Sequence, residues 1–170
     1  WPLRVELLIF DAPDATRTTT VESDLPTTDI KAMIGKLAPL CVLANPTDTA
    51  YGQFVPDPES CEFLANALRG RRSGQGDPLI RAVMTTALFE AVREAELDPA
   101  RFVETALHLL RTEEDPDTHA WLLGAIGTCV GRYLNEDRAG PLREAVTKLL
   151  LTQLETGGSE VPSPRPGFGR

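Results

Sequence analysis

Residues 98–110 read DPARFVETALHLL, an Asp-Pro pair followed by a run of helix-forming residues. The same pair precedes such a run at three other places, Asp57-Pro58, Asp77-Pro78 and Asp115-Pro116. An aspartate carboxylate can accept hydrogen bonds from the free N–H groups of a first helical turn. A proline at the first helical position sacrifices no hydrogen bond. The pairs therefore predict four helix starts, at intervals of 20, 21 and 17 residues.

Five helices are expected after the first of these pairs. Their predicted ranges are 58–69, 78–95, 99–111, 117–134 and 141–155. Apolar residues recur in them at helical spacing, as in Phe102, Ala106 and Leu109. Helices of this length with short connections run antiparallel to their neighbours. Stacked pairs of such helices form a curved array with a concave side.

The first 56 residues have a strand-like pattern instead. Alternation of apolar residues predicts a strand over 3–10, and β-branched residues predict a second strand over 16–22 that pairs back as a hairpin. Further strands are expected over 40–44 and 50–55, and 25–34 stays ambiguous. The expected class is α+β: a partial β-sandwich over 1–56, an antiparallel helical array over 57–156 and a flexible proline- and glycine-rich tail over 157–170.

Composition narrows the classes of function. Of the 170 residues, 42% are hydrophobic and 25% charged, which is ordinary for a soluble globular protein. The net charge is −8, and both main regions are acidic, which argues against a nucleic-acid partner. No apolar run approaches the roughly 20 residues of a membrane helix. The chain begins with Trp1 rather than Met, so we expect it to be part of a longer protein.

The three cysteines, Cys41, Cys61 and Cys129, are far apart and odd in number. They form no disulfide framework, so we expect buried thiols or a reducing compartment, and hence a cytoplasmic protein. Cys129 lies on an apolar helical stripe and is interpreted as core. Cys61 could be exposed, but no neighbour in the sequence would lower its pKa.

A search for metal and anion sites found no convincing set of residues. His108 and His119 are the only histidines and do not form an H-E-x-x-H motif, so we interpret them as surface or interhelix residues. Arginines and glycines over 69–76 could hold an anion, but they lie between two helices and lack the ending of a phosphate loop. We interpret this segment as a solvated loop.

The remaining candidates for chemistry also have structural interpretations. The acids of 94–96 and 113–115 lie at helix ends, where caps are more common than acid–base catalysis. Trp121 is interpreted as core, and no G-x-S-x-G elbow is present. No catalytic, cofactor-binding or metal-ligating residue is assigned to this chain. We expect it to bind no stoichiometric zinc and to cleave no aminoacyl reporter.

Three stretches nevertheless resemble sequence motifs that occur in the same order in a known protein family. Trp1 to Val5 is similar to a W-x-x-P-L strand, and Ala44 to Asp57 is similar to N-x-x-G-Y-Y-R-V-x-Y-D, with Tyr51-Gly52 in inverted order. Asp77 to Leu110 is similar to D-R-x-x-L-x-x-x-A-F-x-L-x-x-x-G-x-L and the helix after it, and Glu113-x-Asp115 to an E-x-D. In this order the chain resembles the C-terminal half of the aminopeptidase N family of zinc aminopeptidases.

The resemblance implies a fold and a function. The fold is the end of a small β-sandwich followed by a HEAT-like helical domain, as in the endoplasmic-reticulum aminopeptidases. The family's G-x-M-E-N anchor and H-E-x-x-H-x18-E zinc site precede this region, so zinc would belong to the parent protein. The expected function is the noncatalytic C-terminal region of an enzyme that removes N-terminal residues from peptides, as scaffold and cover of the substrate cavity.

The resemblance also implies partners: the catalytic domain of the same protein and a peptide substrate. A homo-oligomer is a further expectation, because a partial sandwich would leave an apolar face or an unpaired edge exposed. The alternative function is a free-standing helical-repeat adaptor that binds a protein partner. A third possibility, a small hydrolase, would need a nucleophile and a base that the sequence does not supply. An H-E-x-x-H in the upstream reading frame would favour the aminopeptidase.

Overall fold

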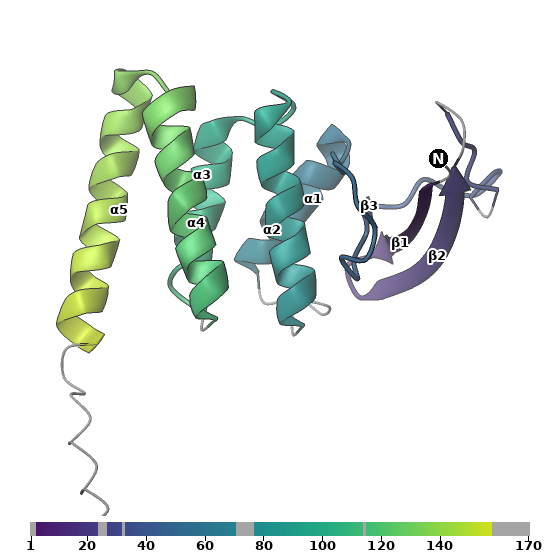
Figure 1. Ribbon diagram of the computed structural model, residues 1–170, viewed down its shortest axis with the longest axis horizontal. Helices are drawn as coiled ribbons and strands as arrows, with labels where there is room; N and C mark the ends of the chain where they lie inside the picture. Colours follow the sequence, from purple (N-terminus) through teal and green to yellow (C-terminus); the bar gives the residue numbers. More distant parts are fainter. Residues whose placement is uncertain (1–2, 24–26, 32, 71–76, 114, 158–170) are drawn as a thin grey trace, which may run out of the picture.

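The computed structural model describes residues 3–23, 27–31, 33–70, 77–113 and 115–157. These residues form an α+β structure in which a sheet precedes a row of helices (Figure 1). The strands are β1 (Leu3–Ala12), β2 (Ala15–Ser23) and β3 (Cys41–Ala44). The helices are α1 (Pro58–Arg69), α2 (Pro78–Arg93), α3 (Pro99–Leu109), α4 (Pro116–Thr128), the π-helical turn η1 (Cys129–Tyr133) and α5 (Glu136–Gly157). Residues 158–170 of the expected tail lie outside the described residues.

The sheet is antiparallel with strand order β2-β1-β3. β1 and β2 form the expected hairpin, with Leu3 opposite Ser23 and Ala12 opposite Ala15. β3 pairs along the second half of β1, with Phe10 opposite Cys41. The strand that we predicted over 50–55 is wrong, because these residues form an irregular segment that crosses to α2. The ambiguous segment 25–34 is neither strand nor helix where it is described.

We expected an exposed apolar face or an unpaired edge. The apolar face is not exposed, because the apolar side chains from Val5 to Phe10 on both faces of β1 are buried, while the residues of β2 are exposed or only partly buried. Leu8 and Phe10 point toward α1, where the Phe10 ring lies 5.1 Å from that of Phe63. Val5, Leu7 and Ile9 point the other way. That second face is covered by the chain's own irregular segments, through Ile30, Met33, Ala50 and Phe54. The outer edge of β2 pairs with no described strand.

All four Asp-Pro pairs begin helices as predicted. The carboxylates of Asp57, Asp77, Asp98 and Asp115 accept hydrogen bonds from backbone N–H groups of the first turn, at distances of 2.8, 2.9, 3.0 and 2.7 Å. Each proline occupies one of the first two helical positions. The caps fix where each helix begins, and so set the length of the connections between them.

α2 ends in a Schellman motif. The N–H of Glu96 donates to the Ala91 carbonyl at 2.8 Å, and the N–H of Ala95 donates to the Val92 carbonyl at 3.1 Å. This ending requires a left-handed residue, and Ala95 has a φ of 62°. Glycine usually fills such a position, because a Cβ is unfavourable there by about 1–2 kcal/mol.

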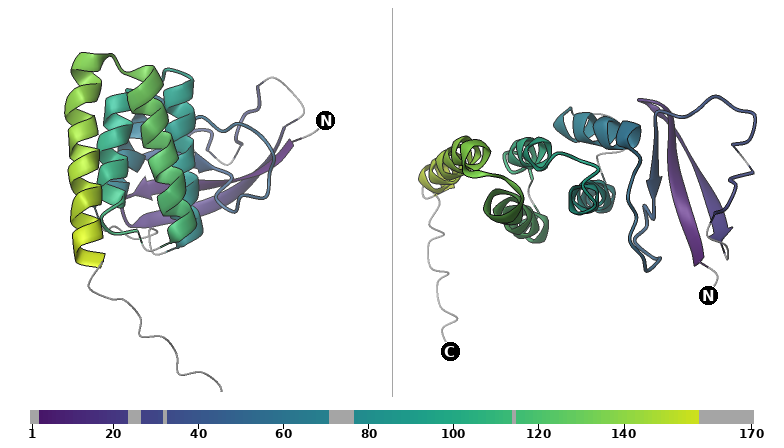
Figure 2. Two further views of the ribbon diagram at one scale, coloured as in Figure 1. Left: turned by 60° about the vertical axis from the view of Figure 1, so that its left-hand side comes forward. Right: turned by 90° about the horizontal axis from the view of Figure 1, so that it is seen from above.

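The helices form two layers (Figure 2). Seen from above, α1, α3 and α5 lie in one row and α2 and α4 in the other. Consecutive helices run in opposite directions, as expected (Figure 1). α3 contacts α1, α2, α4 and α5, which makes it the central helix. Among the described helices, none is both long enough and apolar enough to cross a membrane.

Two helix boundaries differ from the predictions. The helix predicted over 117–134 is α4 followed by η1, where the N–H of Leu134 donates to the Cys129 carbonyl at 3.1 Å. The helix predicted to begin at Pro141 begins at Glu136. Its first turn is capped by Asn135, whose side-chain oxygen accepts from the N–H of Arg138 at 3.2 Å. Pro141 therefore lies inside α5 rather than at its start.

Candidate functional site

The candidate site is a groove between α2 and the segment after β3. Residues 44–54 form one wall, one face of α2 forms the other, and the cavity between them has a volume of about 560 Å³. Binding pockets for small ligands and side chains have volumes of about 300–1,000 Å³. We call this cavity the α2 groove. A larger hollow along α5, of about 860 Å³, involves that helix alone among the described residues.

The loop wall of the α2 groove is fixed by the buried side chain of Asn45. Its Oδ1 accepts hydrogen bonds from the N–H groups of Thr49 and Ala50, at 3.0 and 2.9 Å. Its Nδ2 donates to the Ala50 carbonyl at 2.9 Å. Asn45 has a φ of 57°, a conformation that asparagine adopts more readily than most residues. Its own N–H donates to the Glu6 carbonyl of β1, so the wall is also anchored to the sheet.

Gln53 joins the two walls at one end of the groove. Its Nε2 donates to Oε2 of Glu90 at 2.9 Å and to Oε1 of Glu94 at 2.8 Å. Glu90 also accepts from the Arg93 guanidinium at 2.7 Å, and this hydrogen bond raises the pKa of Arg93. The amide of Gln53 therefore holds the loop against the end of α2.

The helix wall changes from apolar to charged along α2. Leu79 and Val83 lie near its beginning, Thr86 near its middle, and Glu90 and Arg93 near its end. Their spacing of three to four residues places these side chains on one face. At 1.5 Å per residue, this face is about 21 Å long.

The charged end of the groove is negative. Asp48, Glu90 and Glu94 place three negative charges around it, and among the described residues that line the groove Arg93 carries a positive charge that is paired with Glu90. Glu90 and Glu94 also lie at the C-terminal end of α2, which is the negative end of the helix dipole. Carboxylates are unfavourable at that end of a helix, so these two do not serve the stability of α2 through its dipole.

Two apolar side chains of the groove are exposed to solvent. Tyr51 is fully exposed and Leu79 is 44% exposed. The Phe54 ring lies over Gly52, so a Cβ at Gly52 would be 3.3 Å from it. The groove therefore presents aromatic and aliphatic surface beside its charged end.

The other polar residues that we considered do not gather into a second site. His108 is exposed on α3, and His119 is half-buried in the first turn of α4. Within the described part of the chain, no three His, Cys, Asp or Glu side chains are placed to hold a metal ion. The expectation that this chain holds no zinc stays a prediction. In the segment 69–76, Arg69 forms an ion pair with Glu104 at 2.9 Å, and 71–76 lie outside the described residues.

The three cysteines are free and buried. Burial raises the pKa of Cys41 to about 12 and the pKa values of Cys61 and Cys129 to about 11. The suggestion that Cys61 could be exposed is wrong, since its side chain lies in the core beside the Pro56 carbonyl. Thiols with raised pKa values are poor nucleophiles near neutral pH, so all three are structural.

Of the acids at helix ends, Glu113 and Asp115 have structural contacts, whereas the side chain of Glu94 lies at the charged end of the α2 groove. Asp115 caps α4, and Glu94 is the C-terminal cap residue of α2. Trp121 differs from its core interpretation: its side chain is 38% exposed and meets the Phe89 ring edge-on, with ring centroids 5.7 Å apart.

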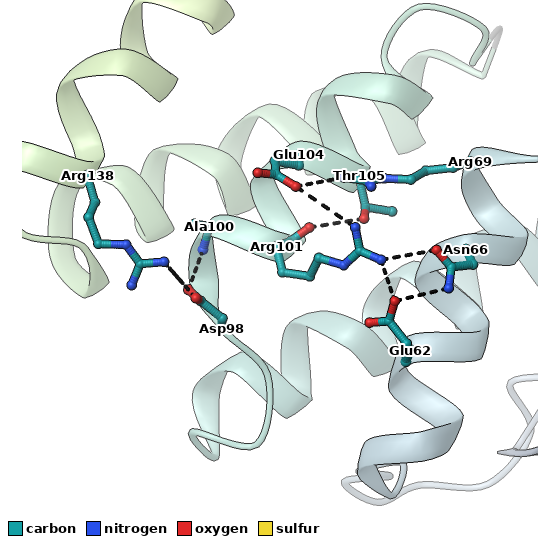
Figure 3. Close-up of polar contacts among 9 residues, drawn as sticks. All are labelled: Glu62, Asn66, Arg69, Asp98, Ala100, Arg101, Glu104, Thr105 and Arg138. Carbon is teal, nitrogen blue, oxygen red and sulfur yellow. Dashed lines mark hydrogen bonds and ion pairs between the residues drawn. The ribbon is translucent and has the colours of Figure 1, made fainter.

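A ladder of polar contacts crosses the layer of α1, α3 and α5 (Figure 3). Arg101 of α3 binds Glu62 and Asn66 of α1, and it also lies near Glu104. Asp98 of α3 binds Arg138 of α5 at 2.6 Å. The acidic and basic side chains of this layer pair with one another, and in the α2 groove Glu90 likewise pairs with Arg93.

Sequence reasoning missed the α2 groove. We had interpreted 50–55 as a strand, which would have placed Tyr51 in a sheet. The residues Asn45-Pro46-Thr47-Asp48 do predict a turn. The sequence does not indicate that the residues after this turn cross to α2. No family model, curated protein or solved structure matches this chain.

Proposed function

We propose that this chain is the noncatalytic C-terminal region of a zinc aminopeptidase. In this proposal the sheet is part of a β-sandwich, and the two-layered helices are a HEAT-like array that covers the substrate cavity. The catalytic domain and zinc would belong to the same parent protein, and the substrate would be a peptide. We also propose a cytoplasmic location, with which three free buried thiols agree.

The observation that carries this proposal is the backbone of Ala95. In the family pattern, a glycine stands 14 residues after the arginine of D-R, and Ala95 stands 14 residues after Arg81. The φ of 62° at Ala95 explains why that position would call for glycine. The pattern's arginine and E-x-D also correspond to residues in contact, since Arg81 binds Glu113 at 3.1 Å.

The upstream reading frame tests the proposal. We expect it to encode H-E-x-x-H and, after eighteen further residues, a glutamate, as the family pattern has them. The parent protein should then release N-terminal residues from an aminoacyl reporter, and a chelator should abolish this activity. A reading frame without that motif would refute the proposal.

The alternative is a helical-repeat adaptor that binds a protein partner. The fully exposed Tyr51 beside a cavity favours it, because exposed aromatic residues are enriched in protein interfaces. The same reading frame discriminates between the two functions. An adaptor would be encoded without an upstream zinc motif.

A further inference from the structure

We propose that the α2 groove binds an extended peptide segment that carries an aromatic side chain next to a basic one. The proposal goes beyond the proposed function, because it concerns a second, noncatalytic contact and depends only on the groove. It holds for an aminopeptidase region and for an adaptor.

The length and depth of the groove fit a short extended peptide. The face from Leu79 to Arg93 is about 21 Å long at 1.5 Å per residue. An extended chain rises about 3.3 Å per residue, so about six residues span it. The volume of about 560 Å³ accommodates an aromatic side chain together with part of its backbone.

The apolar half of the groove supplies the contact for the aromatic side chain. Leu79 and Val83 of α2 face Tyr51 and Phe54 of the loop. Tyr51 makes its whole side chain available, because it is fully exposed in this structure. An aromatic anchor inserted between these side chains would bury apolar surface on both walls, which is the usual basis of a hot spot.

Charge complementarity selects the neighbouring basic side chain. The rim carries Asp48, Glu90 and Glu94, of which Glu90 is paired with Arg93, and the end of the α2 dipole adds further negative potential. A guanidinium or ammonium group there would offset this potential. An acidic peptide would meet repulsion, since like charges held close together lower affinity.

The groove is also preorganised. Asn45 holds the turn through three side-chain hydrogen bonds, and Gln53 ties the loop to Glu90 and Glu94. A wall that is already ordered loses little conformational entropy on binding, so a short segment can bind measurably.

The test is an NMR titration of the ¹⁵N-labelled full chain with the peptide acetyl-Gly-Arg-Phe-Gly-Gly-Gly-amide. Two matched peptides carry Glu in place of Arg, or Ala in place of Phe. Concentrations reach about 5 mM, because a single anchored side chain gives dissociation constants near 1 mM. We expect saturable shifts confined to residues 44–54 and 79–93, with both matched peptides at least about fivefold weaker.

Variants assign the binding to the groove. Tyr51→Ala and Thr86→Arg should weaken the Arg-Phe peptide at least about tenfold, the first through loss of the anchor contact and the second through repulsion by an added positive charge. The matched controls, Leu154→Ala and Thr147→Arg, alter exposed residues of α5 and should change affinity less than about twofold. Far-UV circular dichroism and the urea midpoint establish that each variant is folded.

Three outcomes would overturn the proposal. One is the absence of groove shifts at the highest peptide concentration, and another is an equal response to all three peptides. The third is a set of groove shifts that depends on protein concentration without peptide, which would make a second copy the occupant. None of these outcomes depends on what the upstream reading frame encodes.

Discussion

The guanidinium of Arg81 and the carboxylate of Glu113 form a two-point ion pair that joins α2 to the turn before α4. Nε to Oε2 is 3.2 Å and Nη2 to Oε1 is 3.1 Å. The Glu113 side chain is 3% exposed and that of Arg81 is 23% exposed. Glu113 also accepts from the N–H of Asp115 at 3.1 Å, so the pair orients the residue that caps α4. The ion pair thereby links α2 to the residue at which α4 begins.

Replacement of Glu113 by Ala should lower the free energy of unfolding by about 3 kcal/mol, because it breaks the two-point ion pair with Arg81 in a largely buried place. Urea denaturation followed by circular dichroism measures the change. The matched control is Glu104→Ala, which breaks the exposed pair with Arg69 and should cost less than about 1 kcal/mol. Equal costs for the two variants would mean that burial does not strengthen the Arg81–Glu113 pair.

Replacement of Ala95 by Gly should raise the free energy of unfolding by about 1 kcal/mol, because the left-handed backbone at this position strains a Cβ. Gly has more freedom to lose on folding, and this offsets part of the gain. The control Ala145→Gly, at an exposed position inside α5, should lower the free energy by about 1 kcal/mol. If both variants were destabilising, the strain of the left-handed backbone at Ala95 would cost less free energy than the conformational entropy that glycine loses on folding.

Replacement of Asp98 by Ala should cost about 1–2 kcal/mol, because it removes both the cap of α3 and the ion pair with Arg138. Asp98→Asn keeps a side-chain oxygen for the cap and loses the charge, so it should cost about 0.5 kcal/mol. Chemical denaturation of the three proteins measures the difference. An unchanged denaturation midpoint for Asp98→Ala would show that the cap does not contribute to the stability of α3.

Acid should destabilise the protein through its caps. The Arg138 hydrogen bond lowers the pKa of Asp98, and hydrogen bonds from Thr118 lower the pKa of Asp115. Burial raises the pKa of Asp57, but hydrogen bonds from Ser60 outweigh it and the net direction is down. A carboxyl with a lowered pKa in the folded state contributes stability above its unfolded pKa and loses it as pH falls toward the folded value.

The free energy of unfolding should therefore be nearly constant from about pH 7 to 5 and should fall below about pH 4, where the unfolded carboxyls become protonated. Urea titrations at several pH values measure this curve. Asp98→Asn should lose less stability on acidification than the native chain, because it lacks one of the titrating groups. If both proteins lost the same free energy of unfolding on acidification, Asp98 would not contribute to the acid sensitivity.

The sequence predicted the helices best where a local interaction decides the structure. The caps at Asp57, Asp77, Asp98 and Asp115 depend on atoms within three residues, so the Asp-Pro pairs were sufficient. Asn135 caps α5 by the same chemistry, but the proline that we used as a marker lies five residues after the start of that helix. The prediction failed there because a proline can also be accommodated inside a helix.

The α2 groove could not be predicted because long-range packing creates it. Residues 50–55 read as a strand by composition, yet they pair with none of the described strands. Instead, Gln53 donates hydrogen bonds to Glu90 and Glu94 at the end of α2, which are 37 and 41 residues away in the chain. The positive φ of Asn45, which turns the chain toward α2, also has no unique signature in one sequence.

The division between sheet and helices leads to the last prediction. If the helices after Asp57 formed a core of their own, they would fold by themselves. In the structure, however, one hydrophobic core includes Leu8 and Phe10 of β1 together with Leu64 and Leu68 of α1. Removal of residues 1–56 would expose this face of α1, and the loss of buried apolar surface costs about 25 cal/mol per Å².

A protein that begins at Asp57 should thus remain helical but unfold at a lower urea concentration than the whole chain, and it should associate through the exposed face of α1. Circular dichroism and light scattering measure the two effects. In the whole chain, Phe10→Ala removes the ring contact with Phe63 and should cost about 3–4 kcal/mol for the same reason. A truncated protein that is monomeric and as stable as the whole chain would show that the sheet adds nothing to the helical core.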